Sequence, residues 1–190
     1  MGGLKYPIRH LGDKKVQLAV WRPSSGHWYI KGPGYKDWHK SHGNKAIQIG
    51  TSGDIPVPAD YMGEGKLRMA VWRPSSGHWF IKGNGFADWE NTNGNIVVQC
   101  GIKGDTPVPG DYFGDGIIRM AVWRPSNGMW YIKGKGFSNW GQSQGNIQIQ
   151  FGTNGDIPVP YDYFNEGHLR IAVFRPTEGR WYIRRKGNTY

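Results

Sequence analysis

The chain contains little of what marks membrane, secreted-precursor or disulfide-bonded proteins. Its single cysteine, Cys100, excludes an intrachain disulfide. Cys100 takes the place that Ile49 and Phe151 hold at a spacing of 51 residues, which predicts a packed apolar residue. No apolar run reaches the roughly 18 residues that a membrane helix needs, and residues 1–5 contain no apolar signal core. We therefore expect no membrane span and no signal peptide in this chain, and composition leaves the compartment open.

Acidic residues are also scarce: 14 Asp and Glu face 24 Lys and Arg, which gives a net charge of +10. Such a field favours acidic partners, including sulfated glycans and nucleic acid. The basic residues form no long run and instead recur at fixed positions, namely Lys31, Lys82, Lys133 and Arg184. This spacing favours a solvated basic face, and nucleic acid is an unlikely partner because no recognised nucleic-acid-binding motif is present.

Motifs of catalysis are missing as well. The chain has no Gly-rich phosphate loop before a helix, no helical metal motif and no nucleophile in a recognisable context. His39 and His42 lie close in a loop but make a weak metal candidate. Three acidic residues recur instead, Asp54, Asp105 and Asp156, and repetition favours a structural role in holding turn amides. We predict that the chain is not an enzyme and needs no cofactor or metal.

What the sequence does contain is a repeat of 51 residues. Between residues 53–103 and 104–154, 30 of 51 positions are identical, with no insertion or deletion. The same spacing relates Trp21, Trp72, Trp123 and Phe174. A period of this size is typical of stacked or radial repeat architectures. It divides the chain into residues 2–52, 53–103, 104–154 and 155–190, within a single predicted domain of residues 1–190.

Each repeat has the pattern of a small sheet. In the second repeat we expect strands over residues 55–61, 66–72, 78–82 and 96–100, separated by turns rich in Gly and Pro. Both faces of these strands carry apolar residues, so each sheet should be covered on both sides. Radial packing of four-stranded blades meets this need and leaves only short edges. We predict an all-β propeller of about four blades; the rival β-trefoil would need three repeats.

The last repeat stops short of the outer strand that residues 96–100 supply in the second repeat. A three-stranded closing blade, completion by the N-terminus or a neighbouring chain, and a larger ring made by two subunits are the alternatives that the sequence leaves open.

The segment Gly53-Asp54-Ile55-Pro56-Val57-Pro58-Ala59-Asp60-Tyr61, followed by Ala70-Val71-Trp72-Arg73-Pro74-Ser75-Ser76-Gly77 and Trp79, resembles the bacterial FG-GAP-like (VCBS-type) propeller repeat. Similar sequence segments recur in residues 104–130 and 155–181, so the resemblance covers almost the whole chain. It implies a β-propeller, usually in extracellular or surface proteins with adhesive or ligand-binding roles. It does not identify the ligand, because fold does not fix function.

The resemblance also implies a calcium loop of the form D-x-D-G-D-G-x-x-D, from which this chain departs. The third position is Met or Phe and the ninth is Arg, so two oxygen ligands are lost from each loop, although calcium needs roughly six to eight. We predict that an arginine replaces the ion, with Arg68 bridging Asp60 and Glu64 and Arg119 bridging Asp111 and Asp115. The ion pairs expected in these loops involve Asp60, Arg68, Asp111, Arg119, Asp162 and Arg170. The alternative is that Arg68 points to solvent.

The best candidates for ligand contacts are found among the ten tryptophans. An indole face can stack on a pyranose ring, and Trp suits positions where one end stays wet. One set follows a Gly turn: Trp28, Trp79, Trp130 and Trp181. The other lies in longer loops beside polar residues: Trp38, Trp89 and Trp140. For the first set, packing between blades is the alternative interpretation, and Trp21, Trp72 and Trp123 are predicted to be core.

These observations predict a non-enzymatic binding module with carbohydrate as the leading ligand. Several similar weak sites on one ring would give a lectin-like protein its avidity. The alternative is a protein-interaction or adhesion scaffold that self-assembles, as a homo-oligomer, into a larger ring. The extracellular location rests on the family resemblance alone.

Overall fold

The computed structural model is all-β, and it describes residues 5–9, 16–33, 37–40 and 42–185. It contains four separate antiparallel sheets, one within each repeat, and in each sheet the strands pair in chain order. The first sheet comprises β1 (Lys5–Arg9), β2 (Val16–Arg22), β3 (His27–Ile30) and β4 (Lys45–Gln48). The second comprises β5 (Ile55–Pro56), β6 (Ala70–Arg73), β7 (His78–Ile81) and β8 (Ile96–Gln99).

The other two sheets belong to the C-terminal half. The third comprises β9 (Thr106–Pro107), β10 (Ala121–Arg124), β11 (Met129–Ile132) and β12 (Ile147–Gln150). The fourth has three strands, β13 (Ile157–Pro158), β14 (Ala172–Arg175) and β15 (Arg180–Ile183). Residues 1–4, at the N-terminus that would complete this sheet under one of the alternatives above, lie outside the described residues, as do residues 186–190.

Short 3-10 turns are the only helical elements among the described residues. They are η1 (Trp38–Lys40), η2 (Trp89–Asn91) and η3 (Trp140–Gln142), each in the loop before the fourth strand of its sheet. Within the described ranges, no helix is long and apolar enough to cross a membrane.

Two compact units make up the chain. The first consists of residues 1–74 and 78–97, and the second of residues 75–77 and 98–190. Each unit has its own hydrophobic cluster: the first contains Trp21, Trp28, Ile47 and Val71, and the second contains Trp123, Trp130, Ile132 and Val173. In each cluster one sheet packs against residues of the following repeat.

In the second, third and fourth repeats the first strand is only two residues long, in line with the partial pairing that its prolines predict. The sequence predicts a strand over residues 55–61, whereas β5 covers only Ile55 and Pro56. Proline has no N–H to donate, so the ladder continues only where a donor is present. Val57 N donates to Ala70 O at 2.9 Å, and Ala59 forms an isolated bridge with Arg68.

Paired aromatic residues form the centre of each sheet. Trp21 faces Trp28 across β2 and β3, and Trp72 faces Trp79 in the second sheet. These four indoles are fully buried, as predicted for Trp21 and Trp72. In β6, successive residues on both faces are buried, which confirms that the strand is covered on both sides.

The tight turn between the second and third strands requires glycine. Gly128 has φ +67°, and a Cβ placed there would lie 2.0 Å from Gly152 O. No L side chain fits so close to a backbone oxygen, and a positive φ adds strain. Gly179 has a similar φ of +63°, but a Cβ there would meet nothing within 4 Å.

Candidate functional site

The tryptophans that follow the Gly turns are core residues in three of the four repeats. Trp28, Trp79 and Trp130 are each 0% exposed. This corrects their assignment as ligand platforms, because the neighbouring β4, β8 and β12 strands and the sheet faces leave no ring surface to a ligand. Trp181 is the exception at 57% exposed, since β15 is the last strand of its sheet among the described residues.

The loop tryptophans remain accessible. Trp38 is 37% exposed, and Trp89 and Trp140 are partly exposed. Each begins a 3-10 turn, and an asparagine holds that turn to the sheet. In the second repeat Asn95 Nδ2 donates to Trp89 O at 2.6 Å, and Asn95 Oδ1 accepts from Gly83 N at 2.9 Å. Asn146 makes the equivalent bonds to Trp140 and Gly134.

Buried lysines anchor the same loops from below. Lys82 is 1% exposed, and its Nζ donates to Gly85 O at 2.9 Å and Thr92 Oγ1 at 2.8 Å. Lys133 is 0% exposed, and its Nζ donates to Gly136 O at 2.7 Å. Burial lowers the pKa of both ammonium groups. The sequence places these lysines on a solvated basic face, and the structure corrects that: they are internal supports of the loops.

Beside the Trp loops of the second and third repeats lies an arginine fixed by an aspartate. Arg73 donates through Nε and Nη2 to the two oxygens of Asp54, both at 2.9 Å, and its guanidinium carbon lies 4.2 Å from the centre of the Phe80 ring. Phe80 in turn contacts the Trp89 ring edge-to-face, with centroids 5.7 Å apart. We call Asp54, Arg73, Phe80 and Trp89, and the equivalent four residues of another repeat, the aromatic stack of that repeat.

The aromatic stack recurs in the third repeat. Arg124 binds Asp105 at 2.7 and 3.0 Å and lies 4.2 Å from the Tyr131 ring centre, and Tyr131 contacts Trp140 at 5.7 Å. The hydrogen bonds to Asp54 and Asp105 raise the pKa of Arg73 and Arg124, so both guanidinium groups stay charged. Each aspartate also accepts the N–H of a turn residue three positions earlier, as predicted from its repetition.

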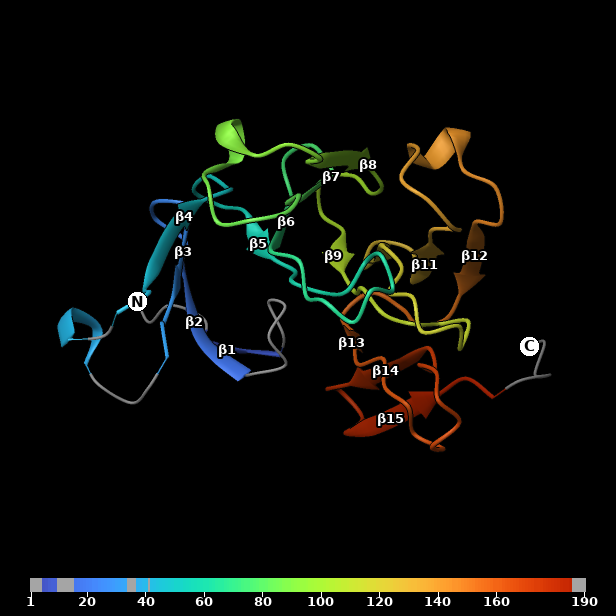
Figure 1. Ribbon diagram of the computed structural model, residues 1–190. Helices are drawn as coiled ribbons and strands as arrows, with labels where there is room; N and C mark the ends of the chain where they lie inside the picture. The colour runs from blue at the N-terminus through green and yellow to red at the C-terminus, as the bar shows by residue number, and fades with distance from the viewer. Residues whose placement is uncertain (1–4, 10–15, 34–36, 41, 186–190) are drawn as a thin grey trace. The chain divides into compact units, whose positions relative to one another are not determined.

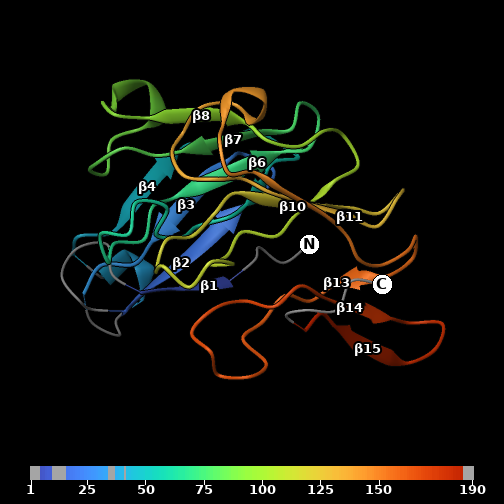
Figure 2. The same ribbon diagram turned by 90° about the vertical axis from the view of Figure 1, so that its right-hand side faces the viewer.

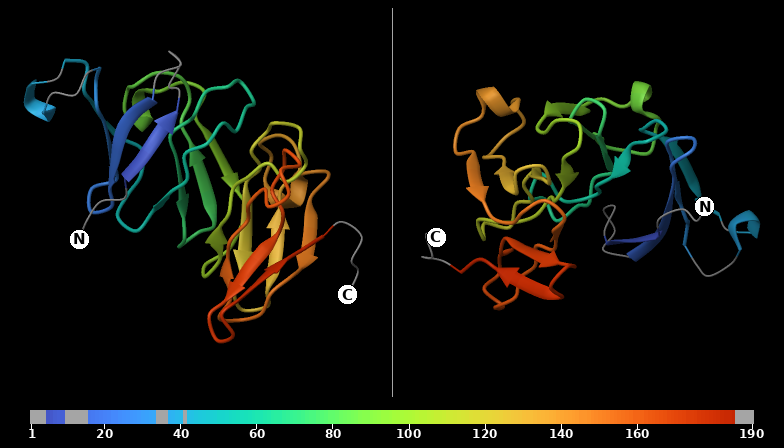
Figure 3. Two further views of the ribbon diagram at one scale, coloured as in Figure 1. Left: turned by 90° about the horizontal axis from the view of Figure 1, so that it is seen from below. Right: turned by 180° about the vertical axis from the view of Figure 1, so that it is seen from behind.

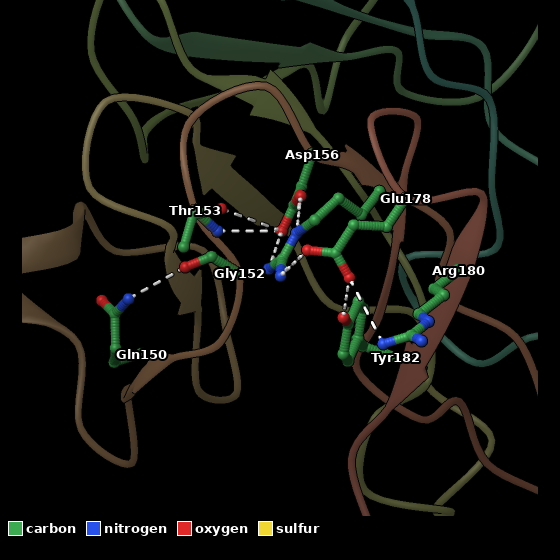
Figure 4. A network of polar contacts seen from close by, with 8 residues as sticks. Gln150, Gly152, Thr153, Asp156, Glu178, Arg180 and Tyr182 are labelled. Carbon is green, nitrogen blue, oxygen red and sulfur yellow. Dashed lines mark hydrogen bonds and ion pairs between the residues drawn. The ribbon is translucent and has the colours of Figure 1, made fainter.

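The fourth repeat contains the same Asp–Arg pair, but the residues around the pair differ (Figure 4). Arg175 donates to Asp156 through Nε and Nη2, and through Nη1 to Glu178 at 3.2 Å. Glu178 also accepts from Tyr182 Oη at 2.5 Å. The hydrogen bond from Arg175 lowers the pKa of Asp156. No counterpart of Trp89 joins this network among the described residues.

The aromatic stacks of the second and third repeats each border an open pocket. The two pockets lie at equivalent positions of the 51-residue repeat. The first pocket, of about 350 Å³, is lined by Gln48, Ile49, Gly50, Thr51, Arg73, Phe80, Asp88, Trp89, Glu90 and Asn91. The second pocket, of about 220 Å³, is lined by Gln99, Gly101, Ile102, Arg124, Tyr131 and Trp140. Every residue that lines the second pocket lies 51 positions after one that lines the first. Each pocket therefore combines the end of one repeat with the aromatic stack of the next.

A side chain from the Trp loop closes the edge of each pocket. Asp88 Oδ1 accepts the backbone N–H of Gln48 at 2.8 Å, and Asn139 Oδ1 accepts that of Gln99 at 2.9 Å. The bond ties the loop to a strand that would otherwise offer an unpaired donor. The loop tryptophans are thus held in place rather than carried on a free loop.

The arginines of the loops at residues 60–68, 111–119 and 162–170 bind only one of the two predicted carboxylates. Arg68 Nη2 donates to Glu64 at 2.8 Å and Arg119 Nη2 donates to Asp115 at 2.6 Å. Arg170 binds Glu166 in the same way. The predicted bridges from these arginines to the first aspartate of each loop are wrong. The carboxylates of Asp60, Asp111 and Asp162 accept backbone N–H groups of their own turns instead, at 2.6–3.1 Å.

Among the described residues, no group of three His, Cys, Asp or Glu side chains is placed to hold a metal ion. Cys100 is buried, and burial raises the pKa of its thiol to about 12, in line with its predicted role as a packed residue.

Comparison with known proteins gives no further assignment: no family model, no curated protein and no solved structure matches the chain.

Proposed function

We propose that the chain is a non-enzymatic, carbohydrate-binding module with a lectin-like, multivalent mode of action. The observation that carries this proposal is the pair of pockets at positions related by the 51-residue repeat, each with an accessible Trp and a fixed Arg. A duplicated pocket is typical of avidity-based binding, in which weak sites act together.

The chemistry of the lining suits a sugar. Trp89 and Trp140 supply apolar ring surface for the C–H face of a pyranose, and Gln48 and Gln99 supply amide groups for hydroxyls. In the first pocket Arg73 lines the wall with its guanidinium held on Asp54 through Nε and Nη2. Rigid support is also in place, because the Asp54 and Asp105 carboxylates fix the guanidinium groups before any ligand arrives.

We also propose that the four sheets are blades of a β-propeller, with the three-stranded sheet as the last blade. Four antiparallel sheets of chain-ordered strands and the resemblance to FG-GAP-like repeats support this arrangement. Electron microscopy of the protein fused to a rigid scaffold would test it, and an open row of sheets would contradict it.

Titration with glycans tests the binding function. A glycan array at low and high salt selects a ligand, and calorimetry then compares Trp89→Ala, Trp140→Ala and the double variant with the unchanged protein. Each single variant should lose about half of the sites, and the double variant should lose binding. Phe86→Ala is the matched control, because Phe86 is an exposed aromatic residue of the same loop that does not line the first pocket. A folded double variant that still binds would exclude these pockets.

A second candidate, self-assembly with another copy of this chain, is favoured by one observation. The ring of Trp181 on β15 is 57% exposed, whereas its counterparts are fully buried, with Trp28 and Trp130 in core clusters that include residues of the following repeat. A further copy could cover this ring. Sedimentation over a wide concentration range should then show that the protein associates. The Trp181→Ser substitution should abolish this association, and the Trp38→Ser control should not affect it. A constant monomeric mass would exclude self-assembly.

A further inference from the structure

The two pockets share one scaffold but differ in charge at the rim. The first pocket is bordered by the carboxylates of Asp88 and Glu90, both exposed. The equivalent positions near the second pocket are Asn139 and Gly141, which carry no charge. The rim of the first pocket therefore has two more negative charges than that of the second.

The charges behind the rim do not compensate for this difference. Arg73 faces the first pocket and Arg124 the second, and each is paired with a buried aspartate through two hydrogen bonds. These pairs contribute equally to both pockets. The two carboxylates at the loop tip stand out because the chain as a whole has a net charge of +10.

We propose that the first pocket prefers sugars that carry a free amine. The second pocket binds the amine-bearing and the neutral forms of these sugars equally well. This inference rests on the carbohydrate-binding function proposed above and adds the ligand class of each site. A protonated amino group on a ring stacked at Trp89 would lie beside the carboxylates of Asp88 and Glu90. Attraction between charges near the surface is modest but additive, and salt screens it.

The experiment uses a chitosan oligosaccharide and its fully N-acetylated form, which share the pyranose backbone and differ in the charge of the amino groups. Calorimetry is done at a pH where the amines are protonated. The Trp140→Ala variant keeps only the first pocket intact, and the Trp89→Ala variant keeps only the second pocket intact. We expect the Trp140→Ala variant to bind the deacetylated form roughly three- to tenfold more tightly than the acetylated form. The Trp89→Ala variant should show no such preference.

Exchange of the rim residues gives a matched test that leaves the indoles in place. Asp88→Asn with Glu90→Gly should remove the preference of the first pocket, and Asn139 already shows that an amide keeps the bond to the neighbouring strand. Asn139→Asp with Gly141→Glu should confer it on the second pocket. The glutamate fits, because a Cβ at Gly141 would meet nothing within 4 Å.

The following results would overturn the inference. Equal binding of both oligosaccharides by the Trp140→Ala variant contradicts it, as does a preference that survives the rim exchange. If both oligosaccharides bind but neither rim exchange alters the ratio, charge at the rim has no role while the carbohydrate function stands. If no folded variant binds either form or any other glycan, the proposed function fails and this inference fails with it.

Discussion

The buried Asp–Arg pair at each pocket should contribute far more to stability than the exposed ion pairs of the same chain. Asp105 is the clearest position at which to test this, because its side chain is 1% exposed and that of Arg124 is 20% exposed. The carboxylate accepts two bonds from Arg124 and one from Ile102 N at 3.0 Å. Asp105→Asn keeps the size of the side chain but removes the charge and places an amide donor against the guanidinium.

Removal of one partner from a buried pair costs about 3–5 kcal/mol when the other charge stays buried. Arg124 retains some contact with water and Asn retains one acceptor, so we expect a loss of about 2–3 kcal/mol in the free energy of unfolding. For a protein with an m-value of about 2 kcal/mol/M in urea, this lowers the midpoint by roughly 1–1.5 M. Unfolding followed by tryptophan fluorescence measures the change, because Trp123 and Trp130 lie in the same unit.

The control is Glu178→Gln, which also removes a carboxylate bound to an arginine but at an exposed position. We expect no resolvable change there, since exposed pairs contribute little. Equal losses for the two variants would refute the reasoning that burial sets the strength of these pairs. Arg124→Met combined with Asp105→Asn should cost less than the sum of the single variants, because the charge left behind by either one is then gone.

Further predictions concern turns and titrating groups. Gly179→Ala should cost only the strain of a positive φ, about 1–2 kcal/mol, whereas Gly128→Ala should cost clearly more because of the clash with a backbone oxygen; equal losses in urea unfolding would contradict this. Because Arg175 lowers the pKa of Asp156 below its unfolded value of about 3.9, stability should fall as pH drops below that value, and Asp156→Asn should flatten the fall in acid titrations. Burial lowers the pKa of Lys133, so the unfolded chain binds more protons in the alkaline range and stability should gain with rising pH there. Lys133→Met should remove that gain in melting curves taken across the alkaline range, and an unchanged slope would show that the lysine does not contribute.

Much of the fold follows from the sequence because the repeat constrains each residue several times. The identical spacing of Trp21, Trp72 and Trp123 predicts core positions, and all three are buried. Strand lengths were harder to predict. Pro56 and Pro58 have no N–H to donate, so the sequence predicts partial pairing over residues 55–61, but it does not give the end of the strand, which covers only Ile55 and Pro56.

The candidate site was only partly predictable for a different reason. The tryptophans at positions 79 and 89 both lie beside polar neighbours in the sequence, yet one is 0% exposed and the other lines a pocket. Which one is buried depends on the adjacent strand and the adjacent repeat, and neither is visible in the local pattern. The recurrence of Arg73 and Arg124 was visible, but their partners lie 19 residues away in sequence and become neighbours only when β5 pairs with β6 and β9 with β10.

The two pockets also show how a repeat can separate stability from specificity. Asp54, Arg73 and their counterparts Asp105 and Arg124 are identical, and they fix the pocket walls from beneath. The loop tip changes between the repeats, and there the structure tolerates change: Glu90 is exposed, and Gly141 has open space around it. A substitution at the tip alters what the rim attracts without loss of a core contact, whereas a substitution in the wall destabilises the unit. If the proposed binding function holds, differences between repeats at the loop tips set ligand preference, whereas differences in the walls affect folding.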